Sequence, residues 1–296
     1  MDSLLNSISH DPYLFNVKHF KFSAWLGHAP FMKFIFREFK PKVFVELGTH
    51  NGFSYFVGCQ SIVECGLDCK AFAVDHWIGD AQAGFFDEDI YNEVVATNQE
   101  YSGFSTLLKM SFSDALPLFE NHSVDLLHID GFHSYESVSE DFNTWLEKMS
   151  DNGIVLLHDI HVRRNTFGVY KFWAEIKEKY RTIEFVGSHG LGVVFLGKVP
   201  DGILTELFEI SNAGGLPQIQ GTFGSITNDV MHELLLRAPS EISNVLAERD
   251  IAIHERDLAR SERDARILEI KMIQDSRIWR STNLVRKLRI LFRKQN

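Results

Sequence analysis

The stretch VFVELGTHNG, residues 43–52, decides the fold of this chain. Its first half is a short apolar run just after Pro41, which is typical of a buried parallel strand. Gly48 and Gly52 frame the turn that follows, and they would let the backbone pass close to a ligand and let a helix begin tightly against it. The dinucleotide-binding pattern of three glycines is not present, because His50 stands between these two. We therefore expect a strand, a ligand-binding turn and a helix.

Apolar runs alternate with helical patterns along the chain from there. They are followed by two runs that face each other across a Ser-His-Gly turn as a hairpin. The later strands are expected at 71–75, 105–112, 124–130 and 154–160, and the hairpin around 182–197. Such alternation predicts an α/β fold with a doubly wound, mostly parallel sheet, helices on both faces and a terminal antiparallel hairpin. Ligands of such sheets bind beyond the carboxyl ends of the strands.

Composition and charge exclude several classes of protein. The chain has 296 residues with a net charge of −10, which argues against a general nucleic-acid binder. No apolar run reaches the length of about 18 residues that a membrane span requires. The first residues do not have the pattern of a secretory signal. The three cysteines lack metal-ligand spacing and fit a reducing compartment, so we expect a cytoplasmic protein.

Four regions are expected: a helical segment at 1–41, the sheet domain at 42–198, a connector at 199–241 and a helical tail at 242–296. In the tail, Glu-Arg-Asp recurs at seven-residue intervals, which predicts either a coiled coil that self-associates or a charged single helix. Residues 276–296 carry seven basic side chains and no acidic one. A basic amphipathic helix of this kind can lie on an anionic membrane surface, on a partner protein or on its own domain.

Acidic residues end or follow the first three predicted strands. The pattern acid-x-Gly-x-x-x-Gly, from Glu46 to Gly52, resembles the first motif of methyltransferases that use S-adenosylmethionine. That resemblance implies that Gly48 and Gly52 lie beside the methionine part of the cofactor. Glu46 would face the sulfonium or amino end, Asp75 would accept hydrogen bonds from both ribose hydroxyls, and Asp114 would meet the adenine amino group. The alternative for each acid is the capping of a helix.

A second polar group ends the fourth and fifth predicted strands. Asp130 and His133 belong to HIDGFHSYE, and His158 and Asp159 belong to LLHDI. Because neighbouring parallel strands end at the same edge of a sheet, these side chains should converge beside the methyl group of the cofactor. The alternative for Asp130 and His133 is hydrogen bonding within the loop or capping of the next helix.

Four segments together resemble a known family: VELGTHNGFSY, VDHWIGD, LLHIDGFHSYESVSEDFNTWL and GIVLLHD. They are similar to the Rossmann-like class I methyltransferase domains found with bacterial glycosyltransferases in surface-polysaccharide loci. More distantly, they resemble metal-dependent sugar O-methyltransferases of macrolide and aminocoumarin biosynthesis. The resemblance covers about residues 20–198, and its most specific elements are Asp-Gly-x-His-x-Tyr and His-Asp.

The resemblance implies roles for the second polar group. In the sugar methyltransferases, the acid that ends the fourth strand and an acidic pair that ends the fifth bind Mg²⁺, and a histidine three residues after the first acid is the base. Asp130 and Asp159 match metal positions, and His133 matches the base. His158 replaces the first acid of the pair, so the cation would be Mn²⁺, Fe²⁺ or Zn²⁺ in preference to Mg²⁺, or His158 would only orient Asp159.

The sequence thus predicts an O-methyltransferase that uses S-adenosylmethionine and a divalent metal, Mg²⁺ or Mn²⁺, to methylate a sugar hydroxyl of a surface glycan or its precursor. The tail would self-associate, or hold the enzyme near a glycosyltransferase or at the inner face of the membrane. Two alternatives remain open: a non-catalytic scaffold of a glycan-assembly complex, and a metal-dependent hydroxylase-like enzyme on the same fold.

Overall fold

The computed structural model describes residues 2–21, 23–80, 84–85, 88–164 and 166–237. The chain divides into two compact units, Met1–Leu234 and Leu235–Asn296. The coiled coil and the basic amphipathic helix predicted for the tail lie outside the described residues. None of the described helices combines the length and the apolar character needed to cross a membrane.

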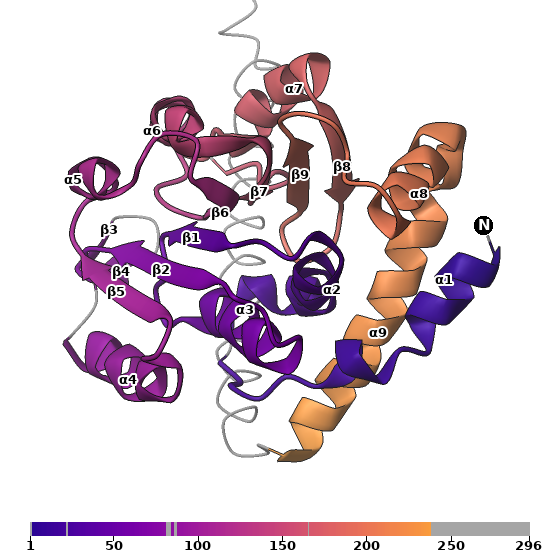
Figure 1. Cartoon of the computed structure of the whole chain (residues 1–296), viewed down its shortest axis with the longest axis horizontal. Helices are drawn as coiled ribbons and strands as arrows, with labels where there is room; N and C mark the ends of the chain where they lie inside the picture. The colour runs from indigo at the N-terminus through magenta and orange to yellow at the C-terminus, as the bar shows by residue number, and fades with distance from the viewer. Residues whose placement is uncertain (1, 22, 81–83, 86–87, 165, 238–296) are drawn as a thin grey trace, which may run out of the picture. The chain divides into compact units, whose positions relative to one another are not determined.

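A seven-stranded sheet with the order β5-β2-β1-β6-β7-β9-β8 forms the centre of the first unit (Figure 1). Its parallel strands are β1 (Val43–Leu47), β2 (Lys70–Asp75), β5 (Ser105–Lys109), β6 (Val124–Ile129) and β7 (Met149–His158). The antiparallel strands are β8 (Arg181–Phe185) and β9 (Leu191–Phe195). A separate small hairpin pairs β3 (Gly79–Asp80) with β4 (Gly84–Phe85). The predicted doubly wound sheet with its terminal hairpin is confirmed.

Helices lie on both faces of this sheet (Figure 1). The α-helices are α1 (Asp2–Ser9), α2 (Ala29–Phe39), α3 (Phe53–Glu64), α4 (Glu88–Asn98), α5 (Phe112–Ala115), α6 (Tyr135–Trp145), α7 (Val169–Lys179), α8 (Ile203–Ile210) and α9 (Leu216–Arg237). Short 3₁₀ segments are η1 (Pro12–Phe15), η2 (Ala24–His28), η3 (Gln99–Tyr101), η4 (Leu116–Leu118) and η5 (Leu146–Lys148), and η6 (Ser211–Gly215) is a π-helical turn.

Two hydrophobic cores follow from the alternation of side chains along the strands. In β1, Phe44 faces the core that contains α2, α3, α8 and α9, whereas Val45 faces the core formed with α5, α6 and α7. Phe44 stacks on Tyr55 of α3 with 5.8 Å between ring centroids. The sheet is therefore buried on both sides, and its strand ends are left as the place for a site.

The predicted connector at 199–241 is corrected by the structure. Phe223 of α9 packs edge-on against Phe31 and Phe34 of α2, with ring centroids 5.4 and 5.5 Å apart. The first unit extends to Leu234, so most of this segment belongs to the main hydrophobic core. The sequence shows only glycines, prolines and scattered apolar residues here, because the partners of these side chains are distant in the chain.

The turn after β1 depends on Gly48. Its φ is +87°, and a Cβ there would lie 2.2 Å from the backbone oxygen of Asp130. The turn is held by hydrogen bonds from the Gly48 amide to the Val74 carbonyl, 2.9 Å, and from the Asp130 amide to the Leu47 carbonyl, 2.8 Å. A side chain would therefore collide with fixed backbone as well as strain the dihedral angle.

We predict that Gly48→Ala lowers the free energy of unfolding by about 2 kcal/mol or more, because strain and a backbone clash add. Urea unfolding followed by circular dichroism measures this loss. Gly103→Ala is the matched control, since nothing lies within 4 Å of a Cβ at this exposed turn position. Equal losses in the two variants would contradict the role given to Gly48.

Candidate active site

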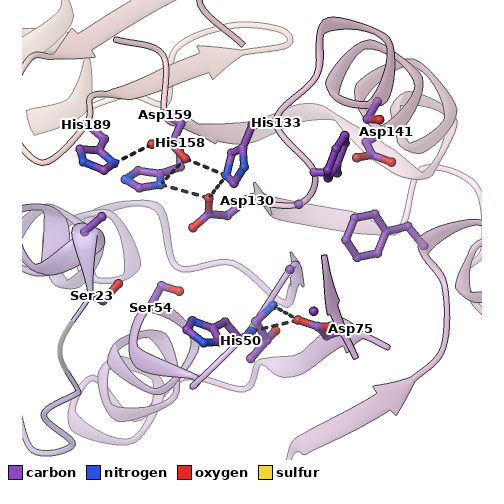
Figure 2. A pocket seen from close by; sticks show the side chains of 18 of the residues that line it. Ser23, His50, Ser54, Asp75, Asp130, His133, Asp141, His158, Asp159 and His189 are labelled. Atoms are coloured by element: carbon purple, nitrogen blue, oxygen red, sulfur yellow. Dashed lines mark hydrogen bonds and ion pairs between the residues drawn. The ribbon is translucent and has the colours of Figure 1, made fainter. Parts of the chain in front are cut away.

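A cavity of about 680 Å³ opens where β1, β2, β6 and β7 end (Figure 2). Its volume falls within the usual range of small-molecule sites. Among the residues predicted from the sequence, the cavity is lined by Gly48, Asp75, Asp130, His133, His158 and Asp159. Glu46, Gly52 and Asp114 do not line it. The structure thus brings together most of the predicted site, and it separates these three residues from the rest.

Asp130, His133 and Asp159 form a cluster at one end of the cavity. The Nε2 of His133 lies 2.7 Å from Oδ2 of Asp159 and 3.5 Å from Oδ1 of Asp130. One ligand atom from each of the three residues lies within 4.8 Å of the others. Asp159 sits just after β7 with φ at +60°, an uncommon conformation that aspartate tolerates better than most residues. The backbone is therefore bent at the point where this carboxylate meets the cluster.

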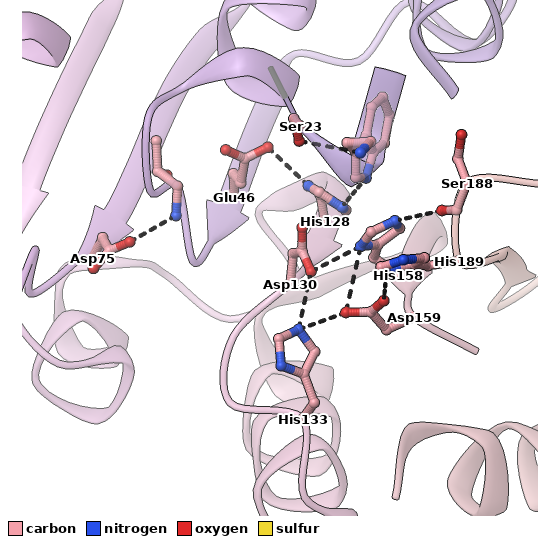
Figure 3. Close-up of polar contacts among 12 residues, drawn as sticks. Ser23, Glu46, Asp75, His128, Asp130, His133, His158, Asp159, Ser188 and His189 are labelled. Carbon is pink, nitrogen blue, oxygen red and sulfur yellow. Dashed lines mark hydrogen bonds and ion pairs between the residues drawn. The ribbon is translucent and has the colours of Figure 1, made fainter. Parts of the chain in front are cut away.

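His158 contacts Asp130 more closely than Asp159, the residue that the sequence expected it to orient. Its Nδ1 lies 3.0 Å from Oδ1 of Asp130, and its Nε2 donates to the carbonyl of Ser188 at 3.0 Å (Figure 3). Burial lowers the pKa of His158, but Asp130 outweighs it and the net shift is upward. Both ring nitrogens of His158 thus have partners among the described residues, and its predicted role as a metal ligand stays a prediction. His158 orients Asp130, because its distance to Asp159 is longer, 3.7 Å.

Interactions between opposite charges stabilise the cluster of Asp130, His133 and Asp159. Burial works against the charged form of His133, but its bonds to Asp130 and Asp159 raise its pKa to about 10. Burial would likewise raise the pKa of Asp159, yet His133 and His189 bring it down to about 2. The ring of His133 stacks on Phe167, with centroids 4.6 Å apart. A histidine that holds its proton at neutral pH can act as base only after this proton has left.

The donor set suits a divalent cation. Two carboxylates and one imidazole supply oxygen and nitrogen ligands, a mixture that fits Mn²⁺ or Fe²⁺ at least as well as Mg²⁺. In the cluster, the proton of His133 neutralises the charge that a cation would neutralise in its place. His133, predicted as a base, is thus one of the three residues that could hold a cation, together with Asp130 and Asp159.

Asp75 holds the turn that follows β1. Its Oδ2 accepts hydrogen bonds from the amides of Thr49 and His50, both at 2.9 Å, and its Oδ1 accepts one from the amide of Trp77 at 2.7 Å. A carboxylate has about four acceptor positions, so little capacity remains for the ribose contact expected from the sequence. Asp75 does line the cavity, and that contact stays a prediction.

Glu46 is buried away from the cavity, and its predicted contact with the cofactor is corrected. Its Oε2 accepts a hydrogen bond from Nδ1 of His128 at 2.8 Å (Figure 3). Nε2 of His128 in turn accepts one from Nε1 of Trp25 at 2.9 Å, which fixes the tautomer. Side chains alternate along a strand, so Glu46 shares the face of Phe44 beneath η2 and α3. Burial raises the pKa of Glu46.

Asp114 and Gly52 lie at the N-terminal ends of two helices, α5 and α3. Asp114 is exposed in α5, where Oδ2 accepts from Oγ of Ser111 at 2.6 Å and the Asp114 amide donates to the same hydroxyl at 3.1 Å. β5 ends at Lys109, earlier than predicted, so Asp114 lies inside the helix. Gly52, with φ at +82°, is the N-cap residue directly before α3. Ser111, and not Asp114, is the N-cap of α5, and Asp114 lies in the first turn of that helix.

The structure adds residues that the sequence analysis missed. Nδ1 of His189, in the turn between β8 and β9, lies 2.9 Å from Oδ1 of Asp159. Ser23, just before η2, lines the same side of the cavity. The hairpin turn could have pointed to His189, because β9 runs antiparallel beside β7 and the turn returns to the carboxyl end of β7. Nothing in the sequence indicated Ser23.

Asp141 of α6 lines the cavity at the side opposite His189 (Figure 2). A Cβ at Gly131 would lie 3.5 Å from its Oδ2 and 2.5 Å from the ring of Phe112, so these three residues form one wall. The side chain is half-buried, and burial, with a smaller contribution from Glu140, raises its pKa to about 7.

Comparison with known proteins agrees with this geometry. Residues 45–160 match the family model described as a methyltransferase domain. With the sheet described above, this match agrees with the predicted class, and residues 45–160 are similar to a methyltransferase domain.

Individual relatives cover different shares of the chain. An uncharacterized protein, y4gI, from Sinorhizobium fredii is 46% identical over 195 residues, which are 66% of this chain and 21% of that protein. The chain thus spans about a fifth of the length of this relative.

Two solved structures are similar at lower identity. A putative caffeoyl-CoA O-methyltransferase from Staphylococcus aureus is 14% identical over 61% of this chain and 86% of its own, with a TM-score of 0.46. TomG, an O-methyltransferase from Streptomyces achromogenes in complex with S-adenosylmethionine, is 14% identical over 67% and 91%, with a TM-score of 0.45.

We predict that Asp141→Asn stabilises the protein, by about 2 kcal/mol above pH 7 and much less near pH 4. The folded protein raises this pKa from 3.8 to about 7, so its stability is lost as the carboxyl ionises between these two values. Asparagine cannot ionise and avoids this loss. Urea unfolding at pH 4.5 and pH 8 measures the difference.

Glu136→Gln, on the exposed side of the same helix, is the control for this measurement. Its effect on the free energy of unfolding should be small at both pH values. A stability gain in Asp141→Asn that does not depend on pH would show that the carboxyl is not held in its neutral form.

Proposed function

We propose that this chain transfers a methyl group from S-adenosylmethionine to a sugar hydroxyl, in a surface glycan or its precursor, with the help of a divalent cation. One observation supports this above the others. Inside a methyltransferase domain, Asp130, His133 and Asp159 converge in the cavity that the Gly48 turn also lines. A cofactor held at this turn would present its methyl group to the cluster.

Methyl transfer is a displacement at carbon, so the acceptor oxygen must lie in line and must lose its proton. Asp130, His133 and Asp159 are the residues that would hold a cation, and the chemistry such an ion supplies is a lowered pKa for a hydroxyl beside it. His158 and His189 keep the two carboxylates oriented, one on each. His133 would take the acceptor proton only from its neutral form, and His189, which is partly exposed, is a second group within reach of that side.

The acceptor side of the cavity carries groups suited to hydroxyls. Ser23, Arg164 and His189 line it, and each can donate a hydrogen bond to a sugar oxygen. The choice of a sugar rests on the resemblance of the sequence to sugar methyltransferases. The glycosyltransferase partner, self-association and attachment to an anionic membrane rest on the composition of the tail, and they belong to the same proposal.

The two alternatives, a non-catalytic scaffold and a hydroxylase-like enzyme, differ from a methyltransferase in the groups that they require. A scaffold needs neither the cavity nor two ionised carboxylates held by three histidines. Burying such a cluster of charges costs stability, which favours a function for it. A hydroxylase-like enzyme would use iron and a co-substrate and would work without S-adenosylmethionine. Nothing in the geometry favours it over methyl transfer.

We predict that the protein binds S-adenosylmethionine and that Mn²⁺ or Mg²⁺ raises its melting temperature. Asp159→Asn should abolish the metal-dependent shift and lower methyl transfer at least about hundredfold, because one carboxylate of the cluster is lost. Calorimetry measures cofactor binding, and transfer of a labelled methyl group to nucleotide sugars and glycans measures activity. Glu136→Gln, outside the cavity, is the control.

No heat of binding and no thermal shift, with or without either metal, would rule out the methyltransferase and leave the scaffold. Full activity in Asp159→Asn, or full activity in the presence of a strong chelator, would leave methyl transfer standing and remove the metal from the proposal.

A further inference from the structure

The order of the strands sets the direction in which the cofactor must lie. The reacting cluster belongs to the ends of β6 and β7, whereas the cavity continues past β1 and β2 to Ser111 and Phe112, which follow β5. S-adenosylmethionine is longer than the cluster is wide, and its methyl group must face the cluster. Its base, at the far end of the molecule, therefore belongs over β2 and β5, on the side of Phe112 and away from His189.

This far side has flat aromatic surfaces. Phe112 lies against Gly131, and Phe132, a large hydrophobic side chain that remains 38% exposed, also lines the cavity. An exposed aromatic ring at the rim of a polar cavity offers a face on which a base can stack. The acid predicted for the base, Asp114, does not reach this place, because it binds Ser111 within its own helix.

Asp141 is the acid that does reach it. Its carboxyl lies beside Phe112 and Gly131 on the cavity wall, and no hydrogen bond or ion pair with the other described residues satisfies it. A half-buried carboxyl without a partner costs stability. A carboxyl in such a position can present both an acceptor and, when protonated, a donor. The edge of adenine carries the complementary pair, the exocyclic amino group and a ring nitrogen.

We propose that Asp141 recognises the adenine of S-adenosylmethionine through its amino group, with Phe112 and Phe132 beside the base. This inference rests on the proposed function, and it assigns to α6 a contact that the sequence had assigned to α5. Asp141 is then a specificity residue for the base, separate from the cluster that acts on the acceptor.

The test compares two ligands that differ at one group. S-inosylhomocysteine carries a carbonyl oxygen where S-adenosylhomocysteine has the amino group, so it turns a donor into an acceptor facing Asp141. Calorimetry on the whole chain measures the affinity of both ligands for the wild type, Asp141→Ala, Asp141→Asn and the control Glu136→Gln. At pH 8, where the Asp141 carboxyl is mostly ionised and can only accept hydrogen bonds, the wild type and the control should prefer S-adenosylhomocysteine by about ten- to hundredfold, the value of a hydrogen bond to a charged carboxyl.

Asp141→Ala should bring the ratio of the two affinities close to one, mainly by weakening the binding of S-adenosylhomocysteine. Asp141→Asn should keep S-adenosylhomocysteine bound, because an amide also pairs with adenine, and should bind S-inosylhomocysteine more tightly than the wild type does. A wild-type preference that survives in Asp141→Ala overturns the role of Asp141 while leaving the methyltransferase intact. A wild type that binds neither ligand overturns the proposed function, and this inference with it.

Discussion

The close approach of the Gly48 turn to the backbone of Asp130 is the constraint on which the rest of the site depends. It joins the ends of β1 and β6, and Asp75 at the end of β2 holds the same turn by accepting hydrogen bonds from the amides of Thr49 and His50. Three strand ends are thereby fixed relative to one another without any ligand. Because the cofactor side of the cavity is built from backbone, the side chains around it are left for specificity and chemistry.

A layer of polar contacts beneath the cavity positions the reacting groups. Glu46, His128 and Trp25 form one buried chain, and His158 links Asp130 to the carbonyl of Ser188 in another (Figure 3). Trp25 and Ser188 come from segments outside the parallel core of the fold. The N-terminal segment and the β8–β9 turn therefore hold site residues in place, in addition to packing against the sheet. In a low-dielectric interior such hydrogen bonds restrict the orientation of each carboxylate, although Oε1 of Glu46 has no hydrogen-bond partner among the described residues.

Much of this could be predicted from the sequence. The strands were visible as short apolar runs with turn residues between them, and the convergence of Asp130, His133 and Asp159 followed from the rule that parallel strands end at one edge. The roles of Glu46, Asp114 and His158 could not be predicted. Each depends on a partner far away in the chain, or on a strand that ends a few residues early, as β5 does at Lys109.

The sequence by itself determined the doubly wound sheet, the glycine turn and the edge at which the polar residues gather, because these follow from local periodicity and from the steric freedom of glycine. Only the tertiary structure decided which of these residues face the cavity. Glu46 lies inside β1 and meets the buried His128, whereas Asp75 is the last residue of β2 and reaches the site. Packing of α6 and of the β8–β9 turn brought in Asp141 and His189, because the wall of a cavity is made by elements that the chain order does not place side by side.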